Sequence, residues 1–539
     1  MHKLPFVMTL SQLLVDLAPQ RCLEMENCAD LEINGLCDDS RRVQPGDLFV
    51  AFGGLSSDGR QFVEQAIAKG AVAVIIETET RQNSMESVAQ LEGRQFIHWR
   101  DQVPVIELTD LRHKLSALAD TFFHHPSADL SVIGVTGTNG KTTCAWLLAG
   151  LLAHFNVRAG LIGTLGCGVV EARQVDLELT GFTTPDAIFV QSCLSSLKQR
   201  NCSAVAMEVS SHALSQSRVA AVNFKAAIFT NLSRDHLDFH GDMHSYAAAK
   251  RILFDTQGLV CAVINVDDAT GRELIQSLDK NLQIISCSTR NNVADVYVKN
   301  IRCSMSGTQA DVYTPWGHGL IQTCLIGEFN LNNILLVLSA IVAEGCDFNA
   351  VLEAIKQLDP VPGRMQIVEP PTHVTAVNAD TQQSAAPSNS GADITVVVDY
   401  AHTPDALSAA LQALRPHAVG NLWLIFGAGG ERDNGKRALM GEIAEQYADR
   451  VILTNDNPRN ELPQNIVTDI QAGIRELQNI QVELDRNSAI TCAIEQAACG
   501  DVVLIAGKGH EDYQLVGSER IYFSDYEVAE RELSRRCAA

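Results

Sequence analysis

The stretch that most constrains the fold is "LSVIGVTGTNGKTTCAWLLAGLLAHF", residues 130–155. An apolar run predicts a buried strand, a short glycine-containing loop follows, and a long apolar helix begins near Lys141. The usual phosphate-loop pattern, G-x-x-x-x-G-K-[ST], places its first glycine five residues before the glycine of the G-K pair. That position holds Val135, and the glycines stand at 134 and 137 instead. The order of strand, loop and helix still favours phosphate binding over a bare turn with a surface lysine.

The residue types in this loop suit a nucleotide triphosphate. Gly137 and Gly140 can turn backbone N–H groups towards phosphate oxygens, and Lys141 would lie against the β- and γ-phosphates. Thr142 would place its hydroxyl on Mg²⁺. We therefore expect ATP as a co-substrate and Mg²⁺ as the cofactor.

The rest of the chain alternates apolar strand-like runs with helical patterns, which predicts an α/β protein with mainly parallel sheets. With 539 residues the chain is too long for one hydrophobic core. "HHPS" and "PVPGRM" are plausible linkers, so we expect three domains, residues 1–127, 128–362 and 363–539. The polar stretch 370–393 is interpreted as a flexible surface insertion.

Four predicted strands in the last block end in small or polar residues: "ITVVVDYAHTPDAL", "NLWLIFGAGG", "DRVILTNDNP" and "DVVLIAGKGHED". Ligands of parallel α/β sheets bind at the carboxyl ends of the strands. A binding site is therefore expected where these four segments meet.

Composition excludes several classes of protein. The formal net charge of −23 argues against a nucleic-acid partner. The 15 cysteines include no C-x-x-C pair, so they indicate reduced thiols of a cytoplasmic protein and not a disulfide framework or a zinc site. No run has the ~18 consecutive apolar residues of a membrane span, and the N-terminus is a poor signal peptide. A monomer is expected.

Many ordered motifs resemble one family. "GTNGKTT" is similar to the ATP loop of the Mur ligases and the folylpolyglutamate synthetases, which form amide bonds with ATP. "TTPD", "MEVSSHAL", "TNLSRDHLDFHGDM", "VDYAHTPDAL", "GGERDNGKR", "DNPR" and "AGKGHEDYQ" resemble the Mur ligase that adds the third peptide residue. The resemblance covers nearly the whole chain. It implies a uridine-diphosphate-binding N-terminal domain, a central P-loop-type ATPase domain and a C-terminal Rossmann-like domain.

The resemblance also implies the reaction. Such enzymes activate a carboxylate as an acyl phosphate, which an amine then attacks. Here the acceptor would be UDP-MurNAc-L-Ala-D-Glu and the amine meso-2,6-diaminopimelate, in cytoplasmic peptidoglycan synthesis. Lys141 would be catalytic, and Glu208 and His236 would join Thr142 as Mg²⁺ ligands. The helical pattern around Lys250 by itself indicates a solvated lysine. Many Mur ligases, however, carry a lysine carbamate (N6-carboxylysine) at this position, and the resemblance implies that it would serve here as a further Mg²⁺ ligand.

Binding residues are carried over by position. For ATP they are Gly137, Thr138, Asn139, Gly140, Lys141, Thr142, Thr143, Asn330 and Asp399. For the UDP-linked acceptor they are Ser40, Leu55, Ser56, Ser57, Thr183, Thr184, Ser210, Gln216 and Arg218. The family often has an asparagine just before the two threonines, where this chain has Phe182. For diaminopimelate they are Arg432, Asp456, Asn457, Pro458, Arg459, Gly507 and Glu511.

Two alternatives stay open at this point. A related ligase that adds lysine to the same acceptor, or glutamate to folate, shares the ATP loop, although "DNPR" and "GKGHED" count against it. A P-loop regulator that hydrolyses nucleotide as a switch would also contain "GTNGKTT". A switch would not need a UDP-type first domain or an arginine-bearing third domain.

Overall fold

The computed structural model describes residues 6–15, 17, 27–54, 57–78, 97–171, 174–370 and 393–538. The chain divides into two compact units. One comprises residues 1–134, 156–227 and 252–260, and the other residues 135–155, 228–251 and 261–539. The predicted insertion at 370–393 lies almost wholly outside the described residues.

The N-terminal sheet has the order β3-β4-β5-β7-β6, with β3 Gly35–Cys37, β4 Asp47–Ala51, β5 Ala73–Thr78, β7 Val103–Thr109 and β6 Ile97–Arg100. Only β6 runs antiparallel to its neighbour. Alternation along β4 gives the sheet two buried faces. Leu48 and Val50 pack in the cluster that contains helix α4 (Leu111–Phe122), whereas Phe49 and Ala51 pack in the cluster of α3 (Val63–Ala68).

The largest sheet has the order β11-β10-β9-β12-β8-β13-β14-β15-β16-β17-β18. The strand predicted before the phosphate loop is confirmed as β8, Ser131–Thr136. Three further strands of this sheet are β12 Ala204–Glu208, β13 Phe224–Phe229 and β14 Cys261–Asn265. β9 (Ala159–Gly163), β15 (Gln283–Ser288) and β16 (Val296–Ser304) pair in parallel with β12, β14 and β15 respectively. The ends of the sheet are antiparallel, formed by β10 Gly166–Glu171, β11 Gln174–Glu178, β17 Gly307–Thr314 and β18 Gly317–Thr323.

Two long helices belong to the second unit. The helix predicted after the phosphate loop is confirmed as α5, Lys141–His154, and the other helix is α11, Glu328–Ala343. α11 packs against α5 and against β14 and β15. Both helices are apolar on most sides, as buried helices are. Helix α9, Met243–Arg251, carries Lys250.

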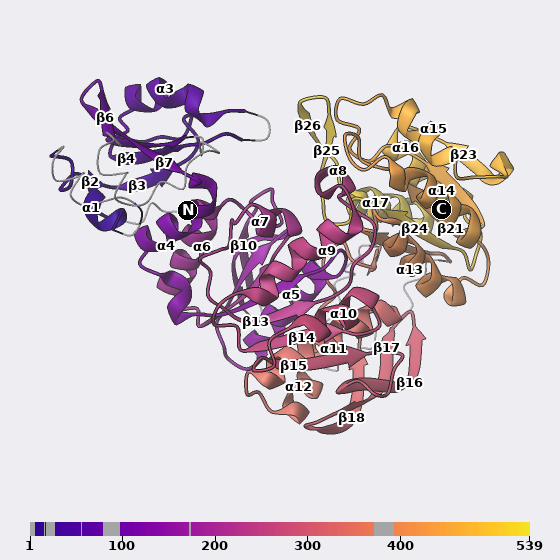
Figure 1. Cartoon of the computed structure of the whole chain (residues 1–539). Helices are drawn as coiled ribbons and strands as arrows, with labels where there is room; N and C mark the ends of the chain where they lie inside the picture. Colours follow the sequence, from indigo (N-terminus) through magenta and orange to yellow (C-terminus); the bar gives the residue numbers. More distant parts are fainter. Residues whose placement is uncertain are drawn as a thin grey trace, which may run out of the picture. The chain divides into compact units, whose positions relative to one another are not determined.

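The C-terminal sheet has the order β19-β20-β24-β21-β22-β23, with β19 Gln366–Ile367, β20 Thr395–Asp399, β24 Val502–Ala506, β21 Leu422–Phe426, β22 Arg450–Leu453 and β23 Ile480–Val482. All but β19 are parallel, which confirms the predicted Rossmann-like arrangement. Helices α13 (Pro404–Leu414), α14 (Gly435–Tyr447) and α15 (Pro463–Gln471) pack on one face, and α16 (Arg486–Gln496) and α17 (Asp525–Ala538) on the other (Figure 1). A hairpin of β25 (Tyr513–Val516) and β26 (Glu519–Tyr522) follows β24.

Within the ranges that the structure describes, no helix combines the length and the apolarity needed to cross a membrane.

Candidate active site

The backbone of the phosphate loop explains its unusual glycine spacing. Gly137 has φ +150° and Gly140 has φ +88°, which side-chain-bearing residues rarely adopt. A Cβ on Gly137 would stand 1.8 Å from Oγ1 of Thr230, and one on Gly140 would stand 2.6 Å from Oδ1 of Asn333. The loop therefore requires glycine at these two positions. Lys141 closes over it, and its Nζ donates to the carbonyl oxygens of Gly137 (2.9 Å) and Thr138 (2.8 Å).

The segment after β13, "TNLSRDH", forms hydrogen bonds with the phosphate loop. The backbone N–H of Asn139 donates to Oδ1 of Asn231 at 2.9 Å. Oγ1 of Thr138 lies 3.2 Å from the carbonyl oxygen of Ser233 and 3.2 Å from the hydroxyl of Tyr246. These contacts fix the loop before any ligand arrives, so little ordering is left to occur on binding.

Lys250 is buried beneath the loop, with 2% of its surface exposed. Its Nζ donates to the carbonyl oxygen of Gly137 at 2.7 Å and lies 4.4 Å from the centre of the Tyr246 ring. Burial, and next the charge of Lys141, lower the pKa of Lys250 well below its usual value, while Asp235 acts in the opposite direction. The interpretation of Lys250 as a solvated helix residue is therefore wrong, because its side chain is buried.

Asp235 is the centre of a buried charge cluster. Its carboxylate lies 3.2 Å from Nζ of Lys436, 3.4 Å from Nε2 of His236 and 3.7 Å from Nε2 of His402. Burial raises the pKa of Asp235, but His402, Lys436 and His236 outweigh it and hold that pKa well below its usual value. A second pair joins Arg234 to Asp433 at 3.3 Å. The "RDH" segment after β13 thus contacts the "RDNGK" segment of the C-terminal block.

Glu208, at the end of β12, belongs to the other compact unit. Its Oε1 accepts from the backbone N–H of Thr164 at 2.7 Å, and Thr164 Oγ1 donates to its Oε2 at 3.1 Å. A Cβ on Gly163 would stand 2.3 Å from Oε1, so glycine makes room for this carboxylate. In the described part of the chain, no group of three or more His, Cys, Asp or Glu residues could hold a metal ion. The oxygens of Glu208 and Thr142 nevertheless are donors of the kind that Mg²⁺ takes.

The predicted acceptor residues of the central block lie together. Thr184 Oγ1 donates to the carbonyl oxygen of Glu208 at 2.9 Å and accepts from the N–H of Ser210 at 2.9 Å. Arg218 Nη1 donates to the carbonyl oxygen of Thr184 at 2.9 Å, and its Nη2 donates to Oε1 of Gln216 at 2.6 Å. Thr183 is connected through Thr164, whose hydroxyl lies 3.1 Å from its own. The structure thus joins all five to the strand end that carries Glu208.

Among the described residues, the other residues predicted to bind the acceptor form no hydrogen bond with the cluster around Thr184. Ser40 is buried and its Oγ donates to Oε1 of Gln65 at 2.8 Å. The carbonyl oxygen of Ser57 accepts from the N–H of Gly54 at 2.8 Å, and Leu55 and Ser56 lie outside the described residues. Phe182, which stands where the family often has asparagine, is 60% exposed.

Two of the predicted ATP-binding residues, Asn330 and Asp399, make contacts within the protein. Nδ2 of Asn330 donates to the carbonyl oxygen of Ile326 at 2.9 Å, and Asn333 donates to Oδ1 of Asn330 at 3.3 Å. Asp399 is buried at the end of β20, where its two oxygens accept from the N–H groups of Met365 (2.6 Å) and Ala401 (2.8 Å). Burial raises the pKa of Asp399. These contacts give Asp399 a role in holding the backbone at the start of the C-terminal block.

The predicted diaminopimelate residues gather at the carboxyl ends of β22 and β24. Nδ2 of Asn457 donates to Oε2 of Glu511 at 3.0 Å. Gly507 has φ +114°, and a Cβ there would stand 2.6 Å from Oδ2 of Asp456, so the two segments approach closely. Nη1 of Arg459 donates to the carbonyl oxygen of Gly430 at 2.8 Å.

The remaining two predicted residues border the same cluster. A Cβ on Gly429 would stand 3.1 Å from Nη1 of Arg459 and 3.6 Å from Cγ of Arg432, so the two arginines are neighbours. Burial, and next Arg432, lower the pKa of Arg459. Pro458 turns its carbonyl oxygen towards Gly430, where a Cβ would stand 2.0 Å from it.

Sequence reasoning missed several charged residues around these sites. Lys508, inside "GKGHED", is fully buried among the predicted diaminopimelate residues. Arg364 donates to Oγ1 of Thr142 at 3.3 Å and stacks 4.1 Å from the centre of the Tyr400 ring. Arg486 and Asp525 form a pair with neither side chain exposed. Lys508 stands between two glycines at a strand end, and this position indicated a site residue. Arg486 has no such sign in the sequence, because it looks like an ordinary arginine on a helix surface.

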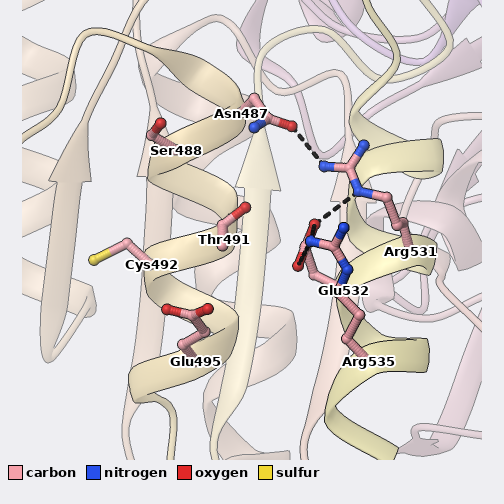
Figure 2. A pocket seen from close by; sticks show the side chains of 8 residues that line it. All are labelled: Asn487, Ser488, Thr491, Cys492, Glu495, Arg531, Glu532 and Arg535. Carbon is pink, nitrogen blue, oxygen red and sulfur yellow. Dashed lines mark hydrogen bonds and ion pairs between the residues drawn. The ribbon is translucent and has the colours of Figure 1, made fainter. Parts of the chain in front are cut away.

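A polar pocket lies elsewhere, between α16 and α17 (Figure 2). In it Arg531 and Arg535 both donate to the carboxylate of Glu532, and Arg531 also donates to Asn487. None of the predicted site residues lines this pocket. This pocket is therefore separate from the clusters of predicted site residues described above.

Comparisons with known proteins cover nearly the whole chain. Three family models match the chain: "Mur ligase family, catalytic domain" at residues 32–123, "Mur ligase middle domain" at 135–341 and "Mur ligase, glutamate ligase domain" at 387–509. Proteins of Coxiella burnetii and Pseudomonas aeruginosa, both named UDP-N-acetylmuramoyl-L-alanyl-D-glutamate–2,6-diaminopimelate ligase, are 42% and 45% identical over 509 and 505 residues. Each alignment covers 94% of this chain and 96% of the relative. A solved structure of a ligase of the same name is 34% identical, with a TM-score of 0.62 over 95% of this chain and 96% of that one.

Proposed function

The chain belongs to the Mur ligase family, and we propose that it joins meso-2,6-diaminopimelate to UDP-N-acetylmuramoyl-L-alanyl-D-glutamate with ATP, in peptidoglycan synthesis. The observation that carries the proposal is the 42–45% identity to ligases of that name over 94% of the chain. The pre-formed phosphate loop and the charged cluster at β22 and β24 support it from the geometry. The division of labour follows: residues 1–127 bind the uridine diphosphate, 128–362 bind ATP, and 363–539 bind the amino acid.

The reaction has two steps. An oxygen of the acceptor's D-glutamate carboxylate attacks the γ-phosphorus of ATP, which forms an acyl phosphate and releases ADP. The free amine of diaminopimelate then attacks the acyl carbon, loses a proton and expels phosphate. Both partners of the first step are anions, so cations must lie between them. Lys141 exchanges its contacts with Gly137 and Thr138 for phosphate oxygens, and the loop N–H groups hold the β-phosphate.

Mg²⁺ would neutralise the phosphate oxygens, and Thr142, Glu208, His236 and Lys250 as a carbamate would hold it. The burial of Lys250 supports the last assignment. A lysine with a depressed pKa has more neutral amine, and the neutral amine is the form that adds carbon dioxide. The carbamic acid that forms then loses a proton, which leaves an anion under the loop in place of the ammonium cation.

Binding of the acceptor is assigned to Ser40, to the segment 55–57 and to the cluster of Thr183, Thr184, Ser210, Gln216 and Arg218. Binding of diaminopimelate is assigned to the cluster at the carboxyl ends of β22 and β24. ATP contacts are assigned to residues 137–143, with Asn330 and Asp399 at the nucleotide's edge. We also propose a cytoplasmic monomer.

The test is an amino-acid screen at fixed ATP and acceptor, with the product identified by mass spectrometry. Diaminopimelate should give the tripeptide, and a preference for lysine would contradict the proposal. Phosphate release measured without acceptor and amino acid separates a ligase from a nucleotide switch, because only a switch hydrolyses ATP by itself.

A further inference from the structure

Lys508 is a fully buried cation in the segment that links β24 to the β25–β26 hairpin. Its Nζ donates to Oε2 of Glu511 at 3.0 Å and to Oδ1 of Asn457 at 3.3 Å, and it lies 5.3 Å from the centre of the Tyr513 ring. Asn457 completes a triangle by donating to the same Oε2 of Glu511 at 3.0 Å. Both hydrogen-bond partners of Lys508 are residues to which the proposed function assigns the amino acid.

The triangle fixes the orientation of two side chains. Oδ1 of Asn457 accepts from Lys508 and from the backbone N–H of Leu515 (2.9 Å), so the amide can turn only its Nδ2 towards Glu511. Oε2 of Glu511 therefore takes two donors. Its Oε1 takes no hydrogen bond from any residue that the structure describes, and the side chain is 15% exposed.

A purely structural role would be charge compensation, in which the ammonium neutralises a buried carboxylate and does nothing more. That role needs only the Lys508–Glu511 pair. It does not account for the second bond to Asn457, which holds the amide in the one orientation that donates to Glu511. An anchored Oε2 beside a free Oε1 is the arrangement expected where a carboxylate is pre-oriented for a ligand cation.

We propose that Lys508 is a positioning residue for the incoming diamino acid: it anchors Oε2 of Glu511, directly and through Asn457, and so leaves Oε1 to accept an ammonium group. The inference rests on the proposed function. Lys508 touches no substrate itself and acts through Glu511. Diaminopimelate and lysine both carry the ammonium groups that a carboxylate would bind, so Lys508 should set the affinity for both amino acids and not the preference between them.

The first experiment measures steady-state kinetics of Lys508→Met in the full-length enzyme. We expect the KM for diaminopimelate to rise by about 10- to 100-fold, as for loss of a hydrogen bond to a charged group. The KM values for ATP and acceptor should stay within about twofold. A partly unfolded preparation lowers kcat without changing KM, so the split between the two separates positioning from misfolding. Lys508→Arg, which keeps the cation, should recover part of the affinity.

Arg520→Met is the matched control. The Arg520 guanidinium stacks 3.9 Å from the centre of the same Tyr513 ring and pairs with Asp512, but it contacts neither Asn457 nor Glu511. This variant should keep the KM of the wild type. An equal rise in KM for Arg520→Met would mean that loss of any cation on Tyr513 disturbs the segment, and it would overturn the inference.

A double-mutant cycle tests whether Lys508 acts through Glu511. Glu511→Gln alone should raise the KM for diaminopimelate, and adding Lys508→Met should raise it little further. Independent, multiplying effects would overturn the inference, as would an unchanged KM in Lys508→Met. Failure of the proposed function looks different, because the wild type itself would then not ligate diaminopimelate.

Discussion

The ammonium nitrogen of Lys250 lies 2.7 Å from the carbonyl oxygen of Gly137, although 113 positions separate the two residues in the chain. Nζ of Lys141, the first residue of helix α5, donates to the same carbonyl oxygen at 2.9 Å. Two lysines therefore converge on one loop oxygen, one of them buried. This convergence couples the nucleotide loop to helix α9, and the first two predictions address its two lysines separately.

Lys141→Ala should abolish amide formation and leave acceptor binding nearly intact. Loss of a single electrostatic donor at a reacting centre costs about 100- to 1,000-fold in rate. The acceptor's nucleotide is assigned to residues 1–127, so its affinity should not depend on the ATP loop. Calorimetric titration with the acceptor measures this, and Lys356→Ala, an exposed lysine paired with Glu353, is the control. A parallel loss of acceptor binding would contradict the division of labour.

Lys250→Ala should be nearly inactive because the proposed carbamate, and with it an anionic ligand position, would be lost. A short carboxylic acid in the buffer should restore part of the activity by occupying the vacated position. Arg251→Ala, on the exposed side of the same helix, should keep wild-type activity, and the carboxylic acid should not change that activity. Wild-type activity in Lys250→Arg, which cannot form the carbamate, would show that no carbamate is needed.

Much of this site could be predicted from the sequence because its residues follow strands that are apolar throughout. "GTNGKTT", "DNPR" and "GKGHED" each end a run whose burial is evident from composition, and parallel strands bring such ends together. The fold class follows from the same alternation. The antiparallel strands β10, β11, β17 and β18 were not predicted, because short strands of mixed polarity look like loops without their partners.

Burial of charged side chains could not be predicted in the same way. Lys250 lies in "YAAAKRILF", where helical periodicity gives no sign that a lysine points inwards. Arg486 and Asp525 are separated by 39 residues, and only the packing of α16 against α17 brings them together. A buried charge is stable only with its partner, and the partner is a property of the tertiary structure.

Breaking the buried Arg486–Asp525 pair should destabilise the C-terminal block. Arg486 also donates to the carbonyl oxygens of Asn455 (3.1 Å) and Ala506 (2.9 Å), which precede the two segments to which we assign the amino acid. Removing one partner of a buried pair costs about 3–5 kcal/mol, so Asp525→Asn should lower Tm by roughly 6–20 °C. Glu353→Gln, in the exposed pair with Lys356, should change Tm by no more than a few degrees. Similar shifts in both variants would contradict the assignment.

Asp501 should make the stability of the same block depend on acid pH. Burial raises the pKa of Asp501, but the indole N–H of Trp423 and the N–H groups of Ala498 and Asn421 outweigh it and hold that pKa below its usual value. A carboxyl with a lowered folded-state pKa contributes stability that is complete above its unfolded pKa, about 3.9. The contribution is lost as pH falls from there through the folded pKa.

Asp501→Asn should therefore cost about 1–3 kcal/mol at pH 7 and progressively less below pH ~4. Thermal unfolding followed by tryptophan emission measures it, with Trp423→Phe to identify the signal of Trp423. If the deficit of Asp501→Asn is the same at pH 7 and pH 3, the lowered pKa of Asp501 does not contribute to folding.

Arg459 should decide the preference for diaminopimelate over lysine. Its backbone is left-handed, with φ +52°, and its N–H and carbonyl are bonded to Leu515 and Gly517 of the hairpin, which fixes where the side chain begins. Nη1 is held by Gly430, while Nε and Nη2 take no acceptor from the described residues. A guanidinium can grip a carboxylate with two parallel hydrogen bonds, and diaminopimelate differs from lysine by one carboxylate on its distal carbon.

Lysine would leave the half-buried Arg459 without that partner, at a cost of roughly 2–5 kcal/mol, or about 30-fold or more in specificity. Arg459→Ala should narrow the preference, mainly by losing activity with diaminopimelate. We assign to Arg432 the other carboxylate, which diaminopimelate and lysine share, so Arg432→Ala should instead weaken the binding of both amino acids. The measurement is kcat/KM for each amino acid in the wild type and both variants. If the ratio of kcat/KM for diaminopimelate to that for lysine is unchanged in Arg459→Ala, Arg459 does not recognise the distal carboxylate, whatever the effect of the substitution on total activity.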